Sequence, residues 1–190
     1  MRAIRYLTLL SVLIAPTAFA QGLYQVEMIL LRQNDVKPAT SPLAPEDWRA
    51  GTPMLSDRAV RQTRLEEETA RLQATPSYTV LMHKAWEQEV GSEPSRVALT
   101  EGDEQYGHFP IEGSIGLKQD RFVAVEATFW INRLDANGGL LQSEQFKQEN
   151  RTVKHGQLTF LDGGHLGLLL KVAPVGARKM PTLDPEMMEQ

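Results

Sequence analysis

The sequence predicts a single domain of the α+β class, with a mainly antiparallel sheet of about six strands and one principal helix. Three observations support this class. Apolar and polar residues alternate in several stretches, one stretch before residue 75 has helical composition, and the strand-like stretches after residue 110 follow one another closely. Consecutive strands with short connections pair as antiparallel hairpins. The domain is expected to cover residues 21–175.

The first 20 residues have the composition of a cleavable secretory signal peptide. Arg2 and Arg5 give a basic start, residues 7–15 form a short apolar run, and Ala18 and Ala20 place small residues where a signal peptidase reads. The apolar run is shorter than the ~20 residues that cross a bilayer. We therefore expect cleavage after Ala20 and a periplasmic protein that has no membrane insertion after cleavage.

The first half of the domain is predicted to hold two strands and the helix. Residues 22–31 alternate and then become continuously apolar, as in a central strand. Residues 34–53 contain four prolines and form a long surface connection, with Trp48 packed back onto the domain. A helix is predicted over residues 56–73, where the opening serine can act as a cap, and a second strand over residues 78–90.

The second half of the domain is predicted to hold consecutive strands. They cover residues 111–117, 121–134, 141–154 and 165–172. Residues 91–110 form a loop, residues 135–139 have the composition of a hairpin turn, and residues 155–164 form a loop or a short helical turn. The tail, residues 176–190, has no periodicity and is expected to be flexible.

Composition and motifs exclude several functions. The chain contains no cysteine, so it has no disulfide, thiol nucleophile or thiolate metal site. It has 20 Lys and Arg and 24 Asp and Glu, and losing the two arginines of the first 20 residues takes the net charge from −4 to −6. This balance disfavours a nucleic acid, which binds basic surfaces. The sequence has no nucleophile elbow, phosphate-binding loop or H-E-x-x-H motif, so we expect no catalytic residue, no metal, no cofactor and no enzyme activity.

Four groups of motifs resemble a known family. They are Tyr24-Gln25-Val26-Glu27-Met28-Ile29 with Glu46-Asp47-Trp48; Tyr78-x-Val80-Leu81-x-His83-x-Ala85-Trp86-x-Gln88; Gly113-x-Ile115-x-Leu117 with Arg121-Phe122-Val123; and Gln148-Glu149-Asn150-Arg151-x-Val153-Lys154 with Leu158-x-Phe160-Leu161-Asp162 and Gly167-Leu168-Leu169. In this order they resemble the CsiV family, the cell-shape integrity proteins of gammaproteobacteria. The chain departs from the family's pattern at Ala124, where a histidine is usual, and at Asp162-Gly163-Gly164, which stands in place of Asp-His-Pro.

The resemblance implies a non-enzymatic, peptidoglycan-associated periplasmic protein that regulates cell-wall synthesis, with roles in cell shape and cell division. It also implies help in activating a class A penicillin-binding protein, through the outer-membrane lipoprotein activator of that synthase. Two alternatives remain. One is a periplasmic adaptor that binds only proteins, and the other is a weak cell-wall hydrolase built on His83 with a carboxylate.

Six residues are candidates for binding the wall or a partner. They are His83, Trp86, Gln88, Arg121, Arg151 and Asp162. An aromatic ring can pack under an apolar sugar face, and an arginine can fork onto a stem-peptide carboxylate. Each idea has a structural alternative, because Trp86 can belong to the core, the arginines can be exposed strand ends and Asp162 can cap a turn. Trp86 and His83 lie on opposite faces of their strand, so one groove holds both only at a bulge or a strand end.

Overall fold

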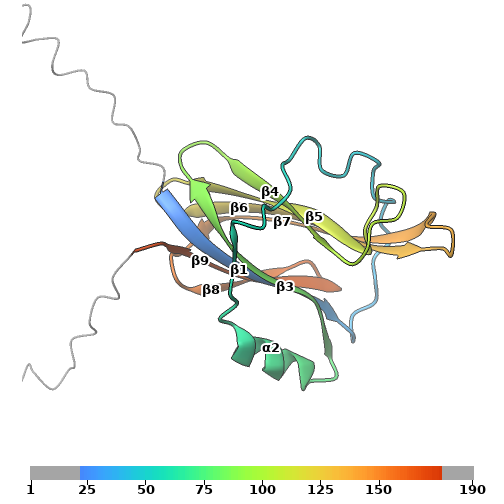
Figure 1. Cartoon of the computed structure of the whole chain (residues 1–190). Helices are drawn as coiled ribbons and strands as arrows, with labels where there is room; N and C mark the ends of the chain where they lie inside the picture. The colour runs from blue at the N-terminus through green and yellow to red at the C-terminus, as the bar shows by residue number, and fades with distance from the viewer. Residues whose placement is uncertain (1–21, 177–190) are drawn as a thin grey trace, which may run out of the picture.

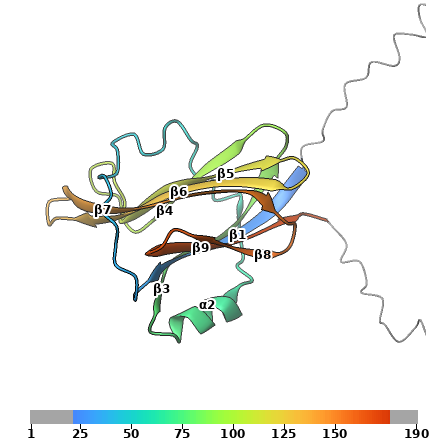
Figure 2. The same cartoon turned by 180° about the vertical axis from the view of Figure 1, so that it is seen from behind.

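The computed structural model describes residues 22–176, which fold into a sandwich of two β-sheets (Figure 1). These residues form nine strands and one helix. The strands are β1 (Gly22–Gln33), β2 (Val60–Arg61), β3 (Tyr78–Val90), β4 (Ser95–Glu101), β5 (Ile111–Gln119), β6 (Val123–Leu134), β7 (Leu140–Val153), β8 (Leu158–Asp162) and β9 (Leu166–Pro174), and the helix is α2 (Glu66–Gln73). The first sheet has the order β2-β3-β1-β9-β8, and the second has the order β4-β5-β6-β7. Figure 2 shows the two layers from behind, with α2 outside the first sheet.

The predicted α+β class, with about six strands and one principal helix, is therefore wrong. Two of the extra strands, β4 and β8, lie in stretches that the sequence analysis assigned to loops, and both stand at sheet edges. An edge strand draws its hydrogen bonds from one partner and is often short, so its own sequence pattern is weak. β8, for example, has only five residues, all of which pair with β9.

The predicted helix over residues 56–73 is correct only in its last eight residues. Its first part instead contains the two-residue strand β2, which pairs with β3. No side chain at the start of α2 caps the helix. Glu27 of β1 anchors the chain just before the helix, because its carboxylate accepts hydrogen bonds from the backbone N–H groups of Arg64 and Leu65. A partner so distant in sequence cannot be read from local propensity.

The six predicted strands lie where the sequence analysis put them, to within about two residues at each boundary. The hairpin turn at residues 135–139 is confirmed, since the Asp135 N–H donates to the Gly139 carbonyl oxygen at 2.8 Å. Trp48 is buried, as predicted. The predicted signal peptide, residues 1–20, and all but the first residue of the predicted tail, residues 176–190, lie outside the described residues.

The hydrophobic core lies between the two sheets. Alternation along β1 turns Val26, Met28 and Leu30 toward the second sheet, where they join one cluster of buried side chains with residues of β3 to β9. Trp86 of β3 and Phe129 of β6 are fully buried in this cluster. No helix among residues 22–176 is long and apolar enough to cross a membrane.

A long loop covers one end of the outer face of the second sheet. In this loop, which joins β1 to β2, Ala44 and Trp48 pack against Ala98 of β4 and Trp130 of β6. The Trp48 indole N–H donates to the carbonyl oxygen of Gly107 at 3.2 Å. The loop leaves the other end of this face uncovered, and that end carries the candidate site.

Candidate functional site

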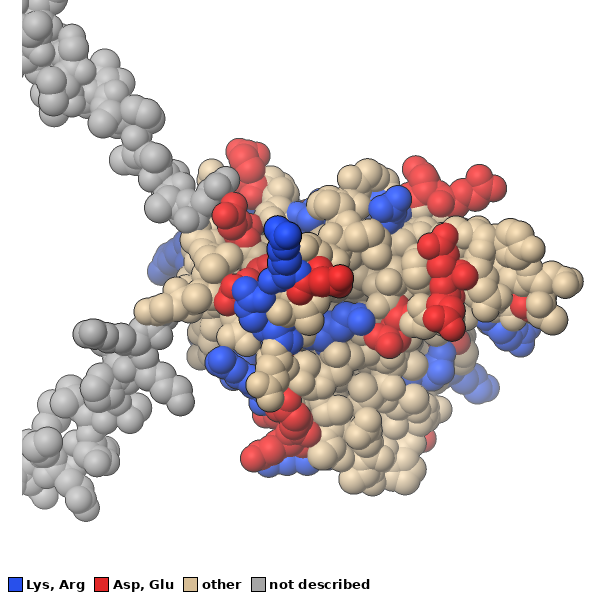
Figure 3. Space-filling model, in the orientation of Figure 1, with Lys and Arg blue, Asp and Glu red and all other residues tan. Residues whose placement is uncertain are grey.

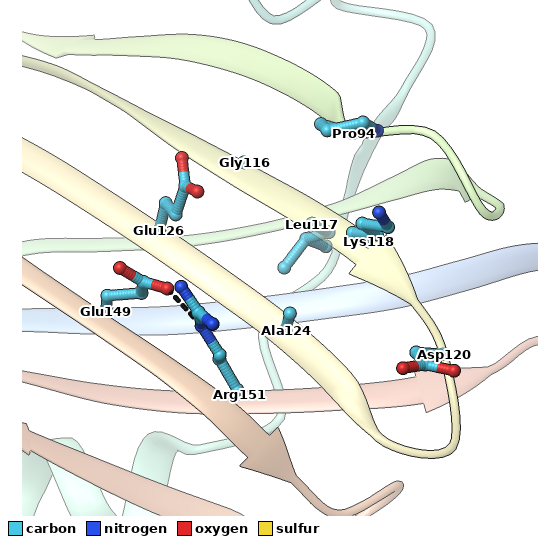
Figure 4. A pocket seen from close by; sticks show the side chains of 9 residues that line it. All are labelled: Pro94, Gly116, Leu117, Lys118, Asp120, Ala124, Glu126, Glu149 and Arg151. Carbon is cyan, nitrogen blue, oxygen red and sulfur yellow. Dashed lines mark hydrogen bonds and ion pairs between the residues drawn. The ribbon is translucent and has the colours of Figure 1, made fainter.

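A groove of about 400 Å³ lies over β5, β6 and β7 on the outer face of the second sheet (Figure 4). Its lining residues are Pro94, Gly116, Leu117, Lys118, Asp120, Ala124, Glu126, Glu149 and Arg151. A second hollow of about 630 Å³ shares Glu126 and Glu149 with the groove and extends to Arg96 and Lys147. The two hollows therefore form one open surface across the second sheet.

Strand alternation places these side chains. In β6, Val123, Val125 and Ala127 point into the core, so the residues between them, Ala124 and Glu126, point outward into the groove. β7 supplies the outward residues Lys147, Glu149 and Arg151 in the same way, with a bulge near its end.

Four neighbouring positions, three of which are charged, form a row across strands β4 to β7, which we call the charged row. Arg96 of β4 pairs with Gly116 of β5, Gly116 pairs with Glu126 of β6, and Glu126 pairs with Glu149 of β7. A β-carbon on Gly116 would lie 3.1 Å from Arg96 Cγ and 3.3 Å from its Cζ. Since glycine has no such atom, the Arg96 side chain lies across β5 and forms an ion pair with Glu126.

Arg151 flanks the other end of this row. Its Nε–H donates to Glu149 Oε1 at 2.6 Å, and its side chain is 80% exposed. The hydrogen bond from Glu149, and then the charge of that carboxylate, raise the pKa of Arg151, so the guanidinium stays charged. Two neighbouring carboxylates therefore stand between two guanidinium groups.

The groove is suited to ionic contacts. None of its lining residues is aromatic, whereas Lys118, Asp120, Glu126, Glu149 and Arg151 carry charge. Charges of both signs are also interspersed over the face of the molecule in Figure 3. Within residues 22–176, no group of three or more acidic or histidine side chains is placed to hold a metal ion.

Three sequence-predicted residues of β3 have partners inside the fold, and none lines the groove. Trp86 is fully buried, and its indole N–H donates to Gln88 Oε1 at 2.9 Å. The Gln88 amide in turn donates to the Ser95 carbonyl oxygen at 2.8 Å, which ties β3 to the start of β4. On the opposite face, His83 Nε2 lies 2.8 Å from Glu27 Oε1, and its Nδ1 lies 3.1 Å from Thr69 Oγ1 of α2.

The other three predicted residues lie at different places. Arg151 lines the groove. Arg121 follows the groove residue Asp120 in the turn between β5 and β6, with its guanidinium 5.6 Å from the centre of the Phe122 ring. Asp162 ends β8 and accepts hydrogen bonds within the fold, from the side-chain amide of Gln33 and the N–H of Gly164. The structure therefore brings only Arg151 and Arg121 to the region of the groove.

The two departures from the family's pattern have different consequences. Ala124, where a histidine is usual, lines the groove, so the short side chain leaves room there. At Gly163 a β-carbon would lie 2.7 Å from Phe146 Cδ2, and Gly164 has a φ of +81° that proline cannot adopt. The loop in this conformation therefore excludes a His-Pro sequence.

Sequence reasoning missed most residues of the charged surface. They are Arg96, Gly116, Lys118, Asp120, Glu126, Lys147 and Glu149. The available signal was the alternation in residues 123–131, which turns Glu126 away from the core. Glu149 lies in the same motif as Arg151, two residues earlier, where strand alternation puts both on one face.

Comparison with known proteins identifies the family. A family model described as "Peptidoglycan-binding protein, CsiV" matches residues 53–175. No curated protein and no solved structure matches the chain. The matched residues make up more than half of the chain and include every residue that lines the groove. The chain therefore belongs to the CsiV family, as its motifs predicted.

Proposed function

We propose that this protein binds peptidoglycan in the periplasm through the groove over β5, β6 and β7. The observation that carries the proposal is that two positions singled out by the family's motifs meet there, namely Arg151 and Ala124. The description of the family as peptidoglycan-binding agrees with this role.

The chemistry of the groove favours the stem peptides of the wall over its sugars. Sugar sites use aromatic rings as apolar platforms, and no aromatic residue lines this groove. Stem peptides carry free carboxylates, which an arginine binds in bidentate fashion. Glu149 is bound to the Nε–H of the exposed Arg151, so the two terminal nitrogens of the guanidinium can still receive a ligand carboxylate. Arg121 is a second candidate contact, at the turn beside the groove.

The proposed cellular role is regulation of cell-wall synthesis without catalysis. In this proposal the signal peptide is cleaved after Ala20, and the wall-bound protein helps an outer-membrane lipoprotein to activate a class A penicillin-binding protein. His83 and its carboxylate neighbour Glu27 make hydrogen bonds within the fold, which favours a structural role over a hydrolytic one. The exposed side chains of Leu158 and Phe160 on the edge strand β8 favour the alternative of an adaptor that binds a protein partner.

Co-sedimentation with purified, protein-free peptidoglycan sacculi tests the proposal. Protein secreted with its own leader should pellet with the sacculi and release no muropeptides. Arg151→Ala should weaken binding about tenfold, as loss of a charged hydrogen bond does. Arg71→Ala is the matched control, because Arg71 is also an exposed arginine paired with a glutamate, but on α2. A wild-type protein that stays in the supernatant would overturn wall binding, and muropeptide release would overturn the non-enzymatic role.

A further inference from the structure

We infer that the groove recognises an amino acid group that bears an ammonium and a carboxylate on one carbon. Glu126 and Glu149 bind the ammonium, and Arg151 binds the carboxylate. The inference rests on the proposed function, since the diamino acid of a wall stem peptide presents such a zwitterionic end when that end is not cross-linked. It names the part of the peptidoglycan that the groove reads.

The first argument is a conflict in the pairing of β6 with β7. Glu126 and Glu149 are direct partners in the register and both line the groove. Like charges directly opposite each other on one face destabilise an antiparallel pair. The next outward pair along the same strands, Thr128 with Lys147, has no such repulsion. Arg96 and Arg151 offset this repulsion only in part, because exposed ion pairs contribute little, and a local feature that disfavours folding is typical of a functional site.

The second argument is the hydrogen-bonding capacity that the two carboxylates retain. Arg96 contacts Glu126 through Oε2, and Arg151 contacts Glu149 through Oε1. Among residues 22–176, Glu126 Oε1 and Glu149 Oε2 have no hydrogen-bond partner. An ammonium has three N–H donors and can bond to both free oxygens at once. Its charge also relieves the repulsion between the two carboxylates.

The third argument is the position of Arg151. Figure 4 shows its side chain beside Glu149, with Glu126 on the next strand. Within the described part of the chain, only its Nε–H donates a hydrogen bond, so the four N–H groups of its two terminal nitrogens remain for a ligand. A carboxylate on the same carbon as the bound ammonium lies within reach of these donors, and a guanidinium holds it by two parallel hydrogen bonds.

Acetylation of the free amines of the sacculi tests this inference. Wild-type protein should bind acetylated sacculi about tenfold more weakly than untreated sacculi, measured as the dissociation constant from pelleted fractions. Glu126→Gln and Glu149→Gln should each bind untreated sacculi about tenfold more weakly, and the double variant should not distinguish the two preparations. Arg151→Ala should bind both more weakly but still distinguish them, because its carboxylates remain. Glu67→Gln is the matched control, since Glu67 is an exposed glutamate paired with an arginine on α2.

The outcomes separate this inference from the proposed function. If wild-type protein binds both preparations equally, the ammonium has no role and the inference fails while wall binding stands. The inference also fails if the variant with both glutamates replaced by glutamine still distinguishes acetylated from untreated sacculi. If wild-type protein binds neither preparation, wall binding itself fails. Thermal unfolding of each variant confirms that it is folded, and the acetylation experiment on wild-type protein requires no variant.

Discussion

Replacing Glu27 by alanine should destabilise the protein strongly without weakening binding to the wall. Glu27 is 3% exposed, and its Oε1 accepts hydrogen bonds from Arg64 N at 2.7 Å and from Leu65 N at 2.8 Å, with His83 Nε2 also at 2.8 Å. The variant removes the acceptor for all three groups. It therefore removes the link between the first sheet and the residues that lead into α2.

The burial of these groups sets the size of the effect. A buried polar group left without its partner costs about 1–3 kcal/mol. The Leu65 N–H is buried, whereas the Arg64 N–H and the His83 ring are partly open to solvent. We therefore expect the free energy of unfolding to fall by about 3–5 kcal/mol. At about 2–4 °C per kcal/mol for a domain of this size, Tm should fall by about 10 °C.

Urea and thermal unfolding followed by circular dichroism measure the loss. Glu27→Gln keeps an oxygen acceptor and should lose about half as much. Glu67→Ala, which removes an exposed ion pair on the same helix, should lose less than about 0.5 kcal/mol. A Glu27→Ala variant within 1 kcal/mol of wild type would refute the reasoning. At a temperature where it is folded, this variant should pellet with sacculi like wild type, because Glu27 lies on the first sheet and the groove on the second.

Three further predictions concern other parts of the fold. Gln88→Leu should lower the free energy of unfolding by about 2 kcal/mol, because the buried Trp86 indole N–H loses its acceptor; urea unfolding measures this loss. The same variant should leave wall binding unchanged in the co-sedimentation assay. Gly164→Pro should lower Tm by several degrees, because proline cannot adopt a φ of +81°; equal Tm values would show that the loop has another accessible conformation. Burial raises the pKa of Tyr24, so the folded state favours the neutral form of this side chain. An unfolded tyrosine ionises at about pH 10, so the free energy of unfolding should fall as the pH rises above that value. Tyr24→Phe should be less stable at pH 7, where it lacks the hydrogen bond to Gln119, but should lose less stability between pH 9 and 11.

The strands that the sequence predicted are those whose own residues show a clear apolar pattern. Residues 123–131 alternate five apolar side chains with outward residues, because one face of β6 points into the core between the sheets. β8 carries little of that signal, since Leu158 and Phe160 are about half exposed and only Leu161 is buried. Its existence depends on pairing with β9. A sandwich with edge strands of this kind therefore looks like a smaller α+β sheet in its sequence.

The charged row was hidden for a different reason, because it depends on register. The turn pairs Leu134 with Leu140, and counting back along both strands from there would put Gln148 opposite Glu126. A register shift between Arg133 and Leu134 adds one residue on β7, so Glu149 takes that place. The composition of the turn does not reveal this shift. Without the pairing, Glu126 and Glu149 are two ordinary outward residues of different strands.

The most distinctive motif of the chain and its candidate site have separate roles. His83, Trp86 and Gln88 each join elements of the fold: His83 links β3 to β1 and α2, and Trp86 and Gln88 link β3 to β4. These contacts specify particular side chains, because each buried polar group needs a partner of fixed geometry. The fold does not require particular side chains in the groove, since the exposed ion pairs there contribute little to stability. Its charges can therefore change without loss of the fold, and we expect a departure such as Ala124 to affect the proposed binding rather than folding.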